Sequence, residues 1–126
     1  MSTIKANTLL HSDGSTTNPP AIPALDKRMA SAWVNFNGTG TVAIYDSFNI
    51  SSITDNGTGL YTANYSVNMP SADGYAYFIS SGKSTNYHNA PLLGTKAAAS
   101  IYFILAVKGT STKEDSNHIS VGTFSL

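Results

Sequence analysis

The stretch SFNISSITDNGTGLYTANYSV, residues 47–67, places the turn-forming run DNGT (55–58) between two segments in which apolar and polar residues alternate. Alternation with a period of two is typical of a strand with one buried face, and an Asn-Gly pair between two such segments indicates a hairpin. We therefore expect strands at 48–53 and 60–69, joined by a tight reversal, DNGTG at 55–59, that sets their register. The expected buried residues of the second strand follow this period: Tyr61, Ala63, Tyr65 and Val67.

The first strand of this hairpin departs from strict alternation. Phe48, Ile50 and Ile53 should lie near one face, although their spacing is not a constant two residues. A bulge or kink between Ser51 and Ser52 would bring the three side chains to the same side.

Five further segments resemble strands because they are rich in aromatic and β-branched residues. They are 32–36, 41–45, 74–80, 99–108 and 118–126. About seven strands at this spacing, with turn residues between them, predict an all-β fold. The expected architecture is an antiparallel β-sandwich of the jelly-roll or Ig-like kind, or a small barrel, rather than a βαβ fold. The long connections 81–98 and 109–117 would be loops.

Alternation within these segments indicates which residues face the core. In the segment 32–36, Trp33 and Asn35 should lie on one face and Val34 and Phe36 on the other. The expected inward residues of the last segment are Ile119, Val121 and Phe124. The run IYFILAV at 101–107 is apolar without interruption, which predicts a strand buried on both faces, in the centre of the sandwich or against a partner subunit.

The first quarter of the chain has a different composition. Residues 11–23 contain three prolines among small polar residues, which excludes a helix and a central strand. Residues 24–31 form the only segment with a helical pattern. We expect an N-terminal arm with a linker at 1–31 and one β-sandwich domain at 32–126. The opening MSTIKANTLLHSDG lacks the apolar core of a signal peptide, so we expect synthesis in a cytoplasm without export by that route.

Charge is sparse in this chain. Only 11% of the 126 residues are charged, seven of each sign, whereas Ser, Thr, Asn and Gly make up about two-fifths. Seven scattered basic residues do not form the basic face of a nucleic-acid-binding protein. Zero net charge also lets copies of the chain approach one another without repulsion. The chain has no cysteine, and its longest apolar run is far shorter than the roughly 20 residues that cross a membrane.

Residues suited to catalysis are few and scattered. The three histidines fall in a linker, a loop and a strand start: His11, His88 and His118. A hydrolase would also need a positioned nucleophile, and no G-x-S-x-G run is present. Asp55 and Asp73 lie in turns, where a carboxylate commonly caps backbone N–H groups. A cation between Asp46 and Asp55 is the alternative. We expect no enzyme activity, no cofactor and no bound metal.

The loop at 81–98 offers the best candidate for ligand contact. Aromatic rings beside amide and hydroxyl groups suit sugars, and loops on rigid β scaffolds often carry binding residues. The candidate contacts to a glycan are Asn86, Tyr87, His88 and Asn89. Most other tyrosines are better explained by packing in the core or at a subunit interface.

Residues 32–78 resemble a pattern found in tail-fibre and other virion proteins of tailed bacteriophages, especially marine and cyanobacterial phages. In that family a Trp-Val-x-Phe strand, an N-G-T-G turn and an S-S-I-T-D-N-G-T-G-x-Y hairpin occur in this order. The matching positions are Trp33, Phe36, Gly38, Gly40, Ile53, Asp55, Gly57, Gly59 and Tyr61. The opening MSTIKANTLL is similar to the start of such proteins, where it begins an attachment segment. The resemblance does not extend over residues 81–126.

The resemblance implies a virion structural protein, a short fibre, knob or capsid decoration, that assembles on the particle, commonly as a homotrimer. Its arm would dock to another phage capsid or tail protein or to sister subunits, and its exposed loops would meet host surface glycans. The candidate anchor residues of the arm are Ile4, Leu9, Leu10, Pro19, Pro20 and Ile22.

Two alternatives remain open at this point. The first is a carbohydrate-binding module or lectin-like domain that acts as a monomer. The second is a depolymerase fragment, which would need an acidic pair that the sequence does not visibly supply.

Overall fold

The computed structural model describes residues 6–8, 10, 14, 29–82 and 89–125. Eight strands form the described domain: β1 (Ala32–Asn37), β2 (Ala43–Phe48), β3 (Ile50–Gly57), β4 (Leu60–Tyr65), β5 (Tyr75–Gly82), β6 (Asn89–Lys96), β7 (Ser100–Val107) and β8 (His118–Ser125). They build two four-stranded sheets, which we call sheet A (order β2-β1-β8-β5) and sheet B (order β3-β4-β7-β6). All strand pairs are antiparallel.

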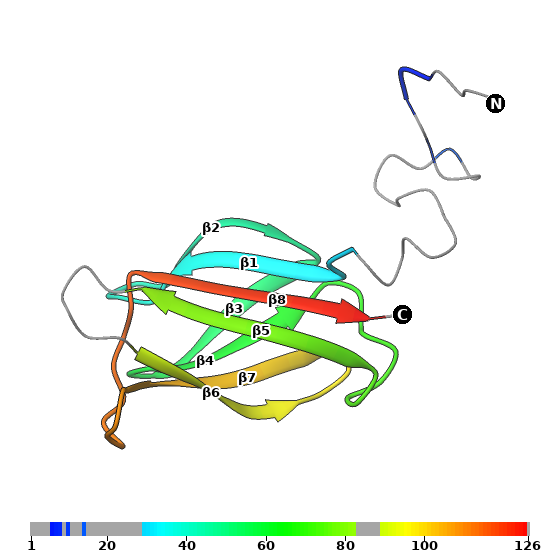
Figure 1. Ribbon diagram of the computed structural model, residues 1–126. Coiled ribbons are helices and arrows are strands. Elements are labelled where there is room, and N and C mark those ends of the chain that lie inside the picture. Colours follow the sequence, from blue (N-terminus) through cyan, green and yellow to red (C-terminus); the bar gives the residue numbers. More distant parts are fainter. Residues whose placement is uncertain (1–5, 9, 11–13, 15–28, 83–88, 126) are drawn as a thin grey trace, which may run out of the picture.

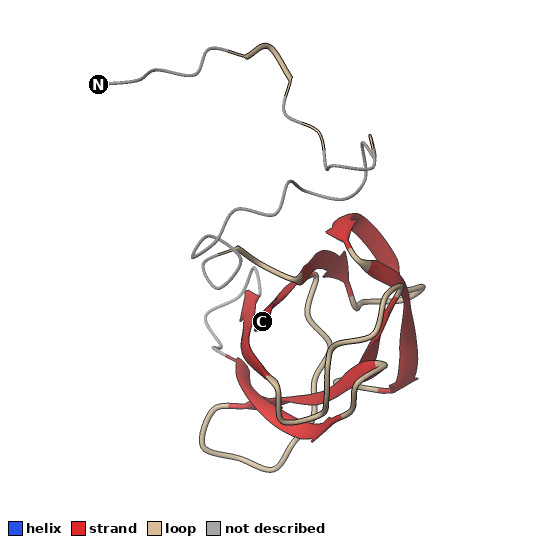
Figure 2. Cartoon of the chain, turned by 90° about the vertical axis from the view of Figure 1, so that its right-hand side faces the viewer, coloured by secondary structure: helices blue, strands red, loops and turns tan. Residues whose placement is uncertain are grey.

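The two sheets lie face to face as two layers (Figure 1). Seen along the strands, they surround the core between them (Figure 2). The predicted all-β antiparallel sandwich is therefore confirmed, with eight strands where the sequence predicts about seven.

Aromatic residues fill the centre of the sandwich. Phe36, Tyr61 and Phe103 are fully buried, and the Phe36 ring meets the Tyr61 ring edge-on at a centroid distance of 5.3 Å and an angle of 73°. Large apolar side chains buried in this way stabilise a fold by about 1.5–3 kcal/mol each. The alternation predicted for β1 is present, with Val34 and Phe36 on the buried face. The buried positions Tyr61, Ala63 and Tyr65 predicted for β4 are confirmed.

Two predicted core residues lie outside the core. Val67 is 70% exposed, because β4 ends at Tyr65 and the chain has left the sheet before residue 67. Thr123 of β8 is buried, so its neighbour Phe124 points to the opposite, outer face of sheet A, against Phe78. Alternation along β8 continues through residue 123, and the prediction that Phe124 faces inward is wrong.

Strand β7 alternates in burial rather than being buried on both faces. Ile101, Phe103 and Leu105 are fully buried, whereas Tyr102 and Ile104 on the outer face are half-buried. A central strand of a two-layer sandwich has one face against the core and the other outward. The prediction from the uninterrupted apolar run is therefore wrong for the single chain.

Between β2 and β3, the chain passes from sheet A to sheet B through a single residue, Asn49. Its φ of 55° lies in the left-handed region, which Asn tolerates better than most residues. Because of this crossing, Phe48 ends on the outer face of sheet A, 43% exposed. Ile50 and Ile53 pack against the core from sheet B. The prediction that Phe48 shares a face with them is wrong.

The central hairpin is confirmed as β3 and β4, with its reversal at the end of the predicted run 55–59. The turn residues are Thr58 and Gly59, because β3 continues to Gly57. The predicted bulge is present between Ile50 and Ser52. Asp55, predicted in the turn, lies within β3 and accepts a hydrogen bond of 2.9 Å from the Gly57 N–H.

Strand β6 lies where the sequence predicts a loop. Among the described residues it is an edge strand, bonded only to β7. Pro91 is tolerated at such an edge because one side of the strand has no ladder partner there. A bulge at Gly94 interrupts its register. A Cβ atom at this position would lie 2.1 Å from the ring of Tyr102. Pro91 and Gly94 thus give this segment the composition of a loop, although it pairs with β7 from Asn89 to Lys96.

The two ends of the sandwich differ. At one end, which we call the loop end, lie the connections 38–42, 58–59 and 108–117, together with the end of β5 and the start of β6. At the other, the arm end, β1 begins and β8 terminates (Figure 1). There Ser31 N–H donates to the Thr123 carbonyl at 2.7 Å. Most of the predicted helix at 24–31 lies outside the described residues, and residues 29–31 are not helical.

Candidate functional site

A hydrogen-bonded cluster joins three separate segments at the loop end. The Tyr61 hydroxyl lies 2.8 Å from the Gly38 carbonyl oxygen and 2.6 Å from Asp115 Oδ1, so its proton has two acceptors. Gly59 N–H donates to the same Asp115 oxygen at 2.7 Å. Gly38 N–H in turn donates to the Ser116 carbonyl at 2.9 Å. The cluster ties the β1–β2 and β3–β4 turns to the segment before β8.

Two glycines of the turn motifs are required by this close approach. A Cβ atom at Gly38 would lie 2.4 Å from the Tyr61 hydroxyl oxygen. One at Gly59 would lie 2.6 Å from the Leu105 carbonyl oxygen and 2.8 Å from the Glu114 nitrogen, and Gly59 also has a φ of +66°. Contacts this short exclude any side chain at these positions without displacement of their neighbours.

The buried tyrosine of the cluster has a structural role. Burial and the neighbouring Asp115 carboxylate raise the pKa of Tyr61 far above its usual range. A phenol in this setting stays protonated and donates a hydrogen bond, so it is neither a nucleophile nor a general base. The β3–β4 hairpin therefore serves to shape and hold the loop end.

A second buried hydroxyl fixes the segment before β8. Ser116 is fully buried, and its Oγ donates to the Gly82 carbonyl at the end of β5. A buried hydroxyl with a carbonyl partner avoids the cost of lost hydration. The end of β5, where the predicted glycan-contact loop begins, is thus held beside the start of β8.

An open hollow of about 260 Å³ lies over the outer face of sheet A towards the loop end. Its lining consists of Asn35, Phe36, Tyr45, His118, Ile119 and Ser120. The Tyr45 ring packs on the His118 ring at a centroid distance of 5.8 Å. The Tyr45 hydroxyl donates to the Asn117 carbonyl at 3.2 Å. Beside the rings, Ser120 Oγ donates to Asn35 Oδ1 at 2.7 Å.

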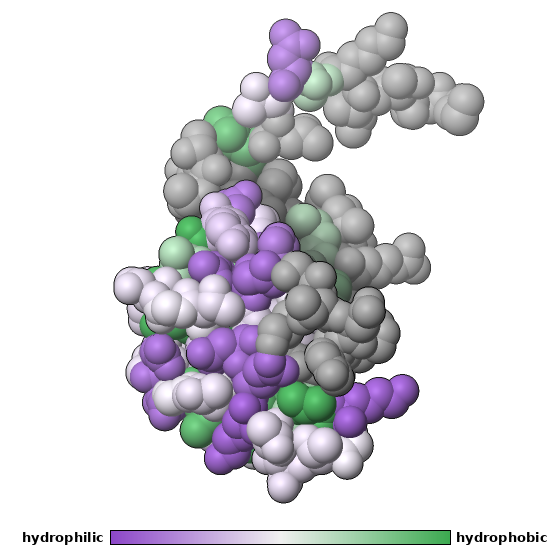
Figure 3. Space-filling model, turned by 90° about the vertical axis from the view of Figure 1, so that its left-hand side faces the viewer, coloured by the Kyte–Doolittle hydropathy of each residue, from purple (hydrophilic) through white to green (hydrophobic). Residues whose placement is uncertain are grey.

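The groups that line this hollow suit an uncharged hydroxylated ligand. An aromatic ring can stack on the C–H groups of a sugar while amides and hydroxyls bind its oxygens. The surface of the loop end is mostly hydrophilic, with small separate apolar patches (Figure 3). Among the described residues, His, Cys, Asp and Glu form no group of three that could hold a metal ion.

Most of the predicted contact and anchor residues fall outside the described residues. Those outside are Asn86, Tyr87, His88, Ile4, Leu9, Pro19, Pro20 and Ile22. Asn89 is the first residue of β6 and pairs with Val107. Leu10 is described and exposed.

Sequence reasoning misses the residues that build the loop end. Asp115 lies 54 residues after Tyr61 and carries no turn or motif signal of its own. Tyr45 and Asn117 are separated by 72 residues. The only part of the loop end that the sequence indicates is its glycine-rich turns. A glycine in a turn can mark a position where another part of the chain packs closely against the backbone, as well as a residue with positive φ.

Comparisons with protein-family models, with curated proteins and with solved structures find no match for this chain. Within the described ranges, the chain contains no helix long and apolar enough to span a membrane.

Proposed function

We propose that this chain is a structural protein of a tailed-bacteriophage virion: a short fibre, knob or capsid decoration protein that forms a homotrimer and is exposed on the particle. The observation that carries the proposal is the contrast between the two ends of the sandwich. Residues 1–28 join the domain at the arm end through Ser31, which bonds to β8. The connections of the loop end lie at the other end (Figure 1), and the hollow lined by Tyr45 and His118 lies towards them.

This arrangement suits a protein that is attached by one end and presents the other. The arm would bind another capsid or tail protein or the sister subunits. The loop end would face outward and contact host surface glycans. A rigid sandwich is an appropriate spacer between the two, because its turns are held by buried hydrogen bonds such as those of Tyr61 and Ser116. The proposal assigns the chain no catalytic activity, no cofactor and no nucleic-acid partner.

The test is detection of the chain on particles. Phage particles purified from the source should contain it at a fixed copy number relative to the major capsid protein, measured by quantitative mass spectrometry. An antiserum against the full chain should label intact particles at one location in negative-stain electron microscopy. Presence in the lysate but absence from purified particles would overturn the proposal.

The hollow lined by Tyr45 and His118 favours a second candidate function, that of a carbohydrate-binding module acting as a monomer. In that case the isolated chain would bind glycans without assembly. A Tyr45→Ala variant should lose binding to an array of bacterial surface polysaccharides, whereas a Tyr102→Ala variant on sheet B should keep it. Binding by a chain that is monomeric throughout would favour this second function over the first.

A further inference from the structure

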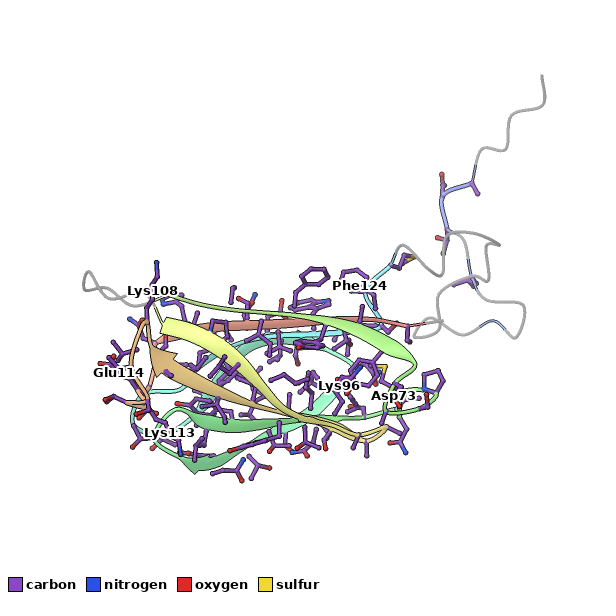
Figure 4. The ribbon with its side chains drawn as sticks, turned by 60° about the horizontal axis from the view of Figure 1, so that its bottom comes forward. Asp73, Lys96, Lys108, Lys113, Glu114 and Phe124 are labelled. Atoms are coloured by element: carbon purple, nitrogen blue, oxygen red, sulfur yellow. The ribbon has the colours of Figure 1, made fainter. Side chains whose placement is uncertain are left out.

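Four aromatic side chains form a band on the outer face of sheet A, near the arm end: Trp33, Phe48, Phe78 and Phe124. Cross-strand pairing places Phe48 beside Trp33, and both Trp33 and Phe78 beside Gly122. The row thus crosses all four strands of the sheet. Phe124, two residues beyond Gly122, packs on Phe78 at a centroid distance of 5.7 Å. Figure 4 shows Phe124 on this face, whereas Lys108, Lys113 and Glu114 lie at the loop end.

This band is unusually exposed for aromatic residues. Phe78 is 68% exposed and Phe48 is 43% exposed, and Trp33 and Phe124 are half-buried. Asp46 is the only Asp, Glu, Lys or Arg in the four strands of sheet A. Asp46 lies beside the row, paired with Asn35, and is not part of it. Contiguous exposed apolar surface marks an interaction site in proteins.

The geometry points to a second copy of this chain as the occupant: we propose that the aromatic band is the surface through which copies associate. The inference rests on the self-assembly in the proposed function and names the surface that performs it. The row spans three strand spacings, about 14 Å. A folded copy, with its own sheet, can cover this width.

The band also provides both parts of a self-complementary contact. Aromatic rings stand on either side of Gly122, and a Cβ atom placed on Gly122 would meet nothing within 4 Å. A ring from another copy can therefore enter the gap between Trp33 and Phe78. The zero net charge of the chain removes the repulsion that would oppose such an approach.

A flat polysaccharide is a poorer fit for the same surface. Stacking on a planar sugar chain needs rings that lie in one plane, but the Phe78 and Phe124 rings are inclined at 86° to each other. Edge-to-face rings of this kind instead offer a ridge and a groove, which suits packing against other apolar side chains.

The experiment uses the full chain and its single tryptophan, which belongs to the band. Solution mass and iodide quenching of Trp33 are measured together for the wild type, for Phe78→Ser and for a matched control, Leu92→Ser. Leu92 is 53% exposed on the outer face of sheet B. Circular dichroism checks that each variant is folded, and Phe48→Ser replaces Phe78→Ser if that variant is not.

We expect an oligomeric wild type in which Trp33 is shielded from iodide. Phe78→Ser should weaken association at least about tenfold, the effect of losing a central interface aromatic, and make Trp33 quenchable, while Leu92→Ser behaves as the wild type. An oligomer that Phe78→Ser leaves intact would overturn the inference but not the proposed virion role, which the particle test decides. A monomeric wild type would also overturn the inference. Shielding of Trp33 in that monomer would indicate that the arm covers the band. Shielding that appears only on addition of insoluble cellulose would indicate that the band binds a polysaccharide.

Discussion

Tyr61 and Tyr65 lie two residues apart on β4, and both are buried, yet their hydroxyl groups have different surroundings. The Tyr61 hydroxyl meets Gly38 and Asp115. Within the described part of the chain, the Tyr65 hydroxyl makes no hydrogen bond of ordinary geometry, and the hydroxyls of Tyr75 and Thr123 are its polar neighbours. A buried hydrogen bond contributes about 1 kcal/mol, and up to about 3 kcal/mol with a charged partner, whereas an unpaired buried hydroxyl contributes nothing or costs energy.

Replacing each tyrosine by phenylalanine should therefore have unequal effects. Tyr61→Phe should lower the free energy of unfolding by about 1–3 kcal/mol, because it removes the bond to the Asp115 carboxylate. Tyr65→Phe should leave it unchanged or raise it slightly. Urea denaturation of both variants measures the difference, and equal losses would contradict the described role of the Tyr61 hydroxyl.

Three buried tyrosines make stability depend on alkaline pH. Burial raises the pKa of Tyr61, Tyr65 and Tyr75 in the folded chain, whereas an unfolded tyrosine ionises near pH 10. Below about pH 10 both states keep these protons, so the contribution is fully present. Above it, the unfolded state loses protons that the folded state retains, and stability falls.

The melting temperature should therefore be flat from neutral pH to about 10 and then decline. Tyrosinate absorbance at high pH should show the buried set ionising together with loss of the fold, and Tyr65→Phe should reduce the steepness of the decline. Ionisation of all seven tyrosines with the near-ultraviolet circular dichroism intact would be the contrary result.

Two glycines with the same backbone conformation provide a matched pair. Gly59 and Gly40 have φ values of +66° and +64°, but a Cβ atom would meet backbone atoms at Gly59 and nothing within 4 Å at Gly40. Gly40→Ala should cost only the left-handed conformation, about 1 kcal/mol. Gly59→Ala should cost at least about 2 kcal/mol more, because Leu105 and Glu114 must move. Similar unfolding midpoints for the two variants would show that the turn is not held as described.

At the scale of elements, the crossing between sheets depends on Asn49. Besides its positive φ, its side-chain nitrogen donates to the Ser31 and Val67 carbonyls, each at 3.1 Å, and its Oδ1 accepts from Val67 N–H at 2.7 Å. One residue therefore closes the junction of β2, β3 and the start of β1.

Substitution of Asn49 can separate backbone strain from lost bonds. Asn49→Gly should destabilise the fold through the lost hydrogen bonds alone, by about 1–3 kcal/mol. Asn49→Ala should cost about 1 kcal/mol more, since alanine disfavours the left-handed region. Chemical denaturation of the pair measures this increment, and an alanine variant at least as stable as the glycine variant would refute it.

The strands that alternate clearly are the ones that sequence reasoning locates, β1 and β4 above all. Alternation is a direct consequence of one buried face, and both strands have one. Strand β6 was missed because Pro91 and Gly94 look like loop residues until the strand is known to be an edge. Phe48 was assigned to the wrong face because a one-residue crossing at Asn49 carries no signal in hydrophobic periodicity. Strand pairing across the whole chain determines both features.

At the scale of the whole molecule, the sequence predicts the sandwich but not the surfaces on it. Tyr45 and His118 line the same hollow, and Trp33 and Phe124 belong to the same band, although each pair is far apart in the chain. The strand order of sheet A brings them together. The residues predicted for glycan contact and for anchoring belong mainly to segments outside the described residues. Their assignment stays a prediction.

The unlike ends and the aromatic band favour the same arrangement. Copies that associate through sheet A near the arm end would bring their arms together at one pole of an assembly and leave the loop ends free. Association through the loop end would instead cover the surface proposed to meet the host.

The solution mass of the full chain, measured by multi-angle light scattering across a dilution series, tests the central claim of assembly most directly. A homotrimer of the 13.3 kDa chain predicts about 40 kDa, three times the mass of one copy. A mass of 13.3 kDa at every concentration would contradict the account and favour a monomeric carbohydrate-binding domain.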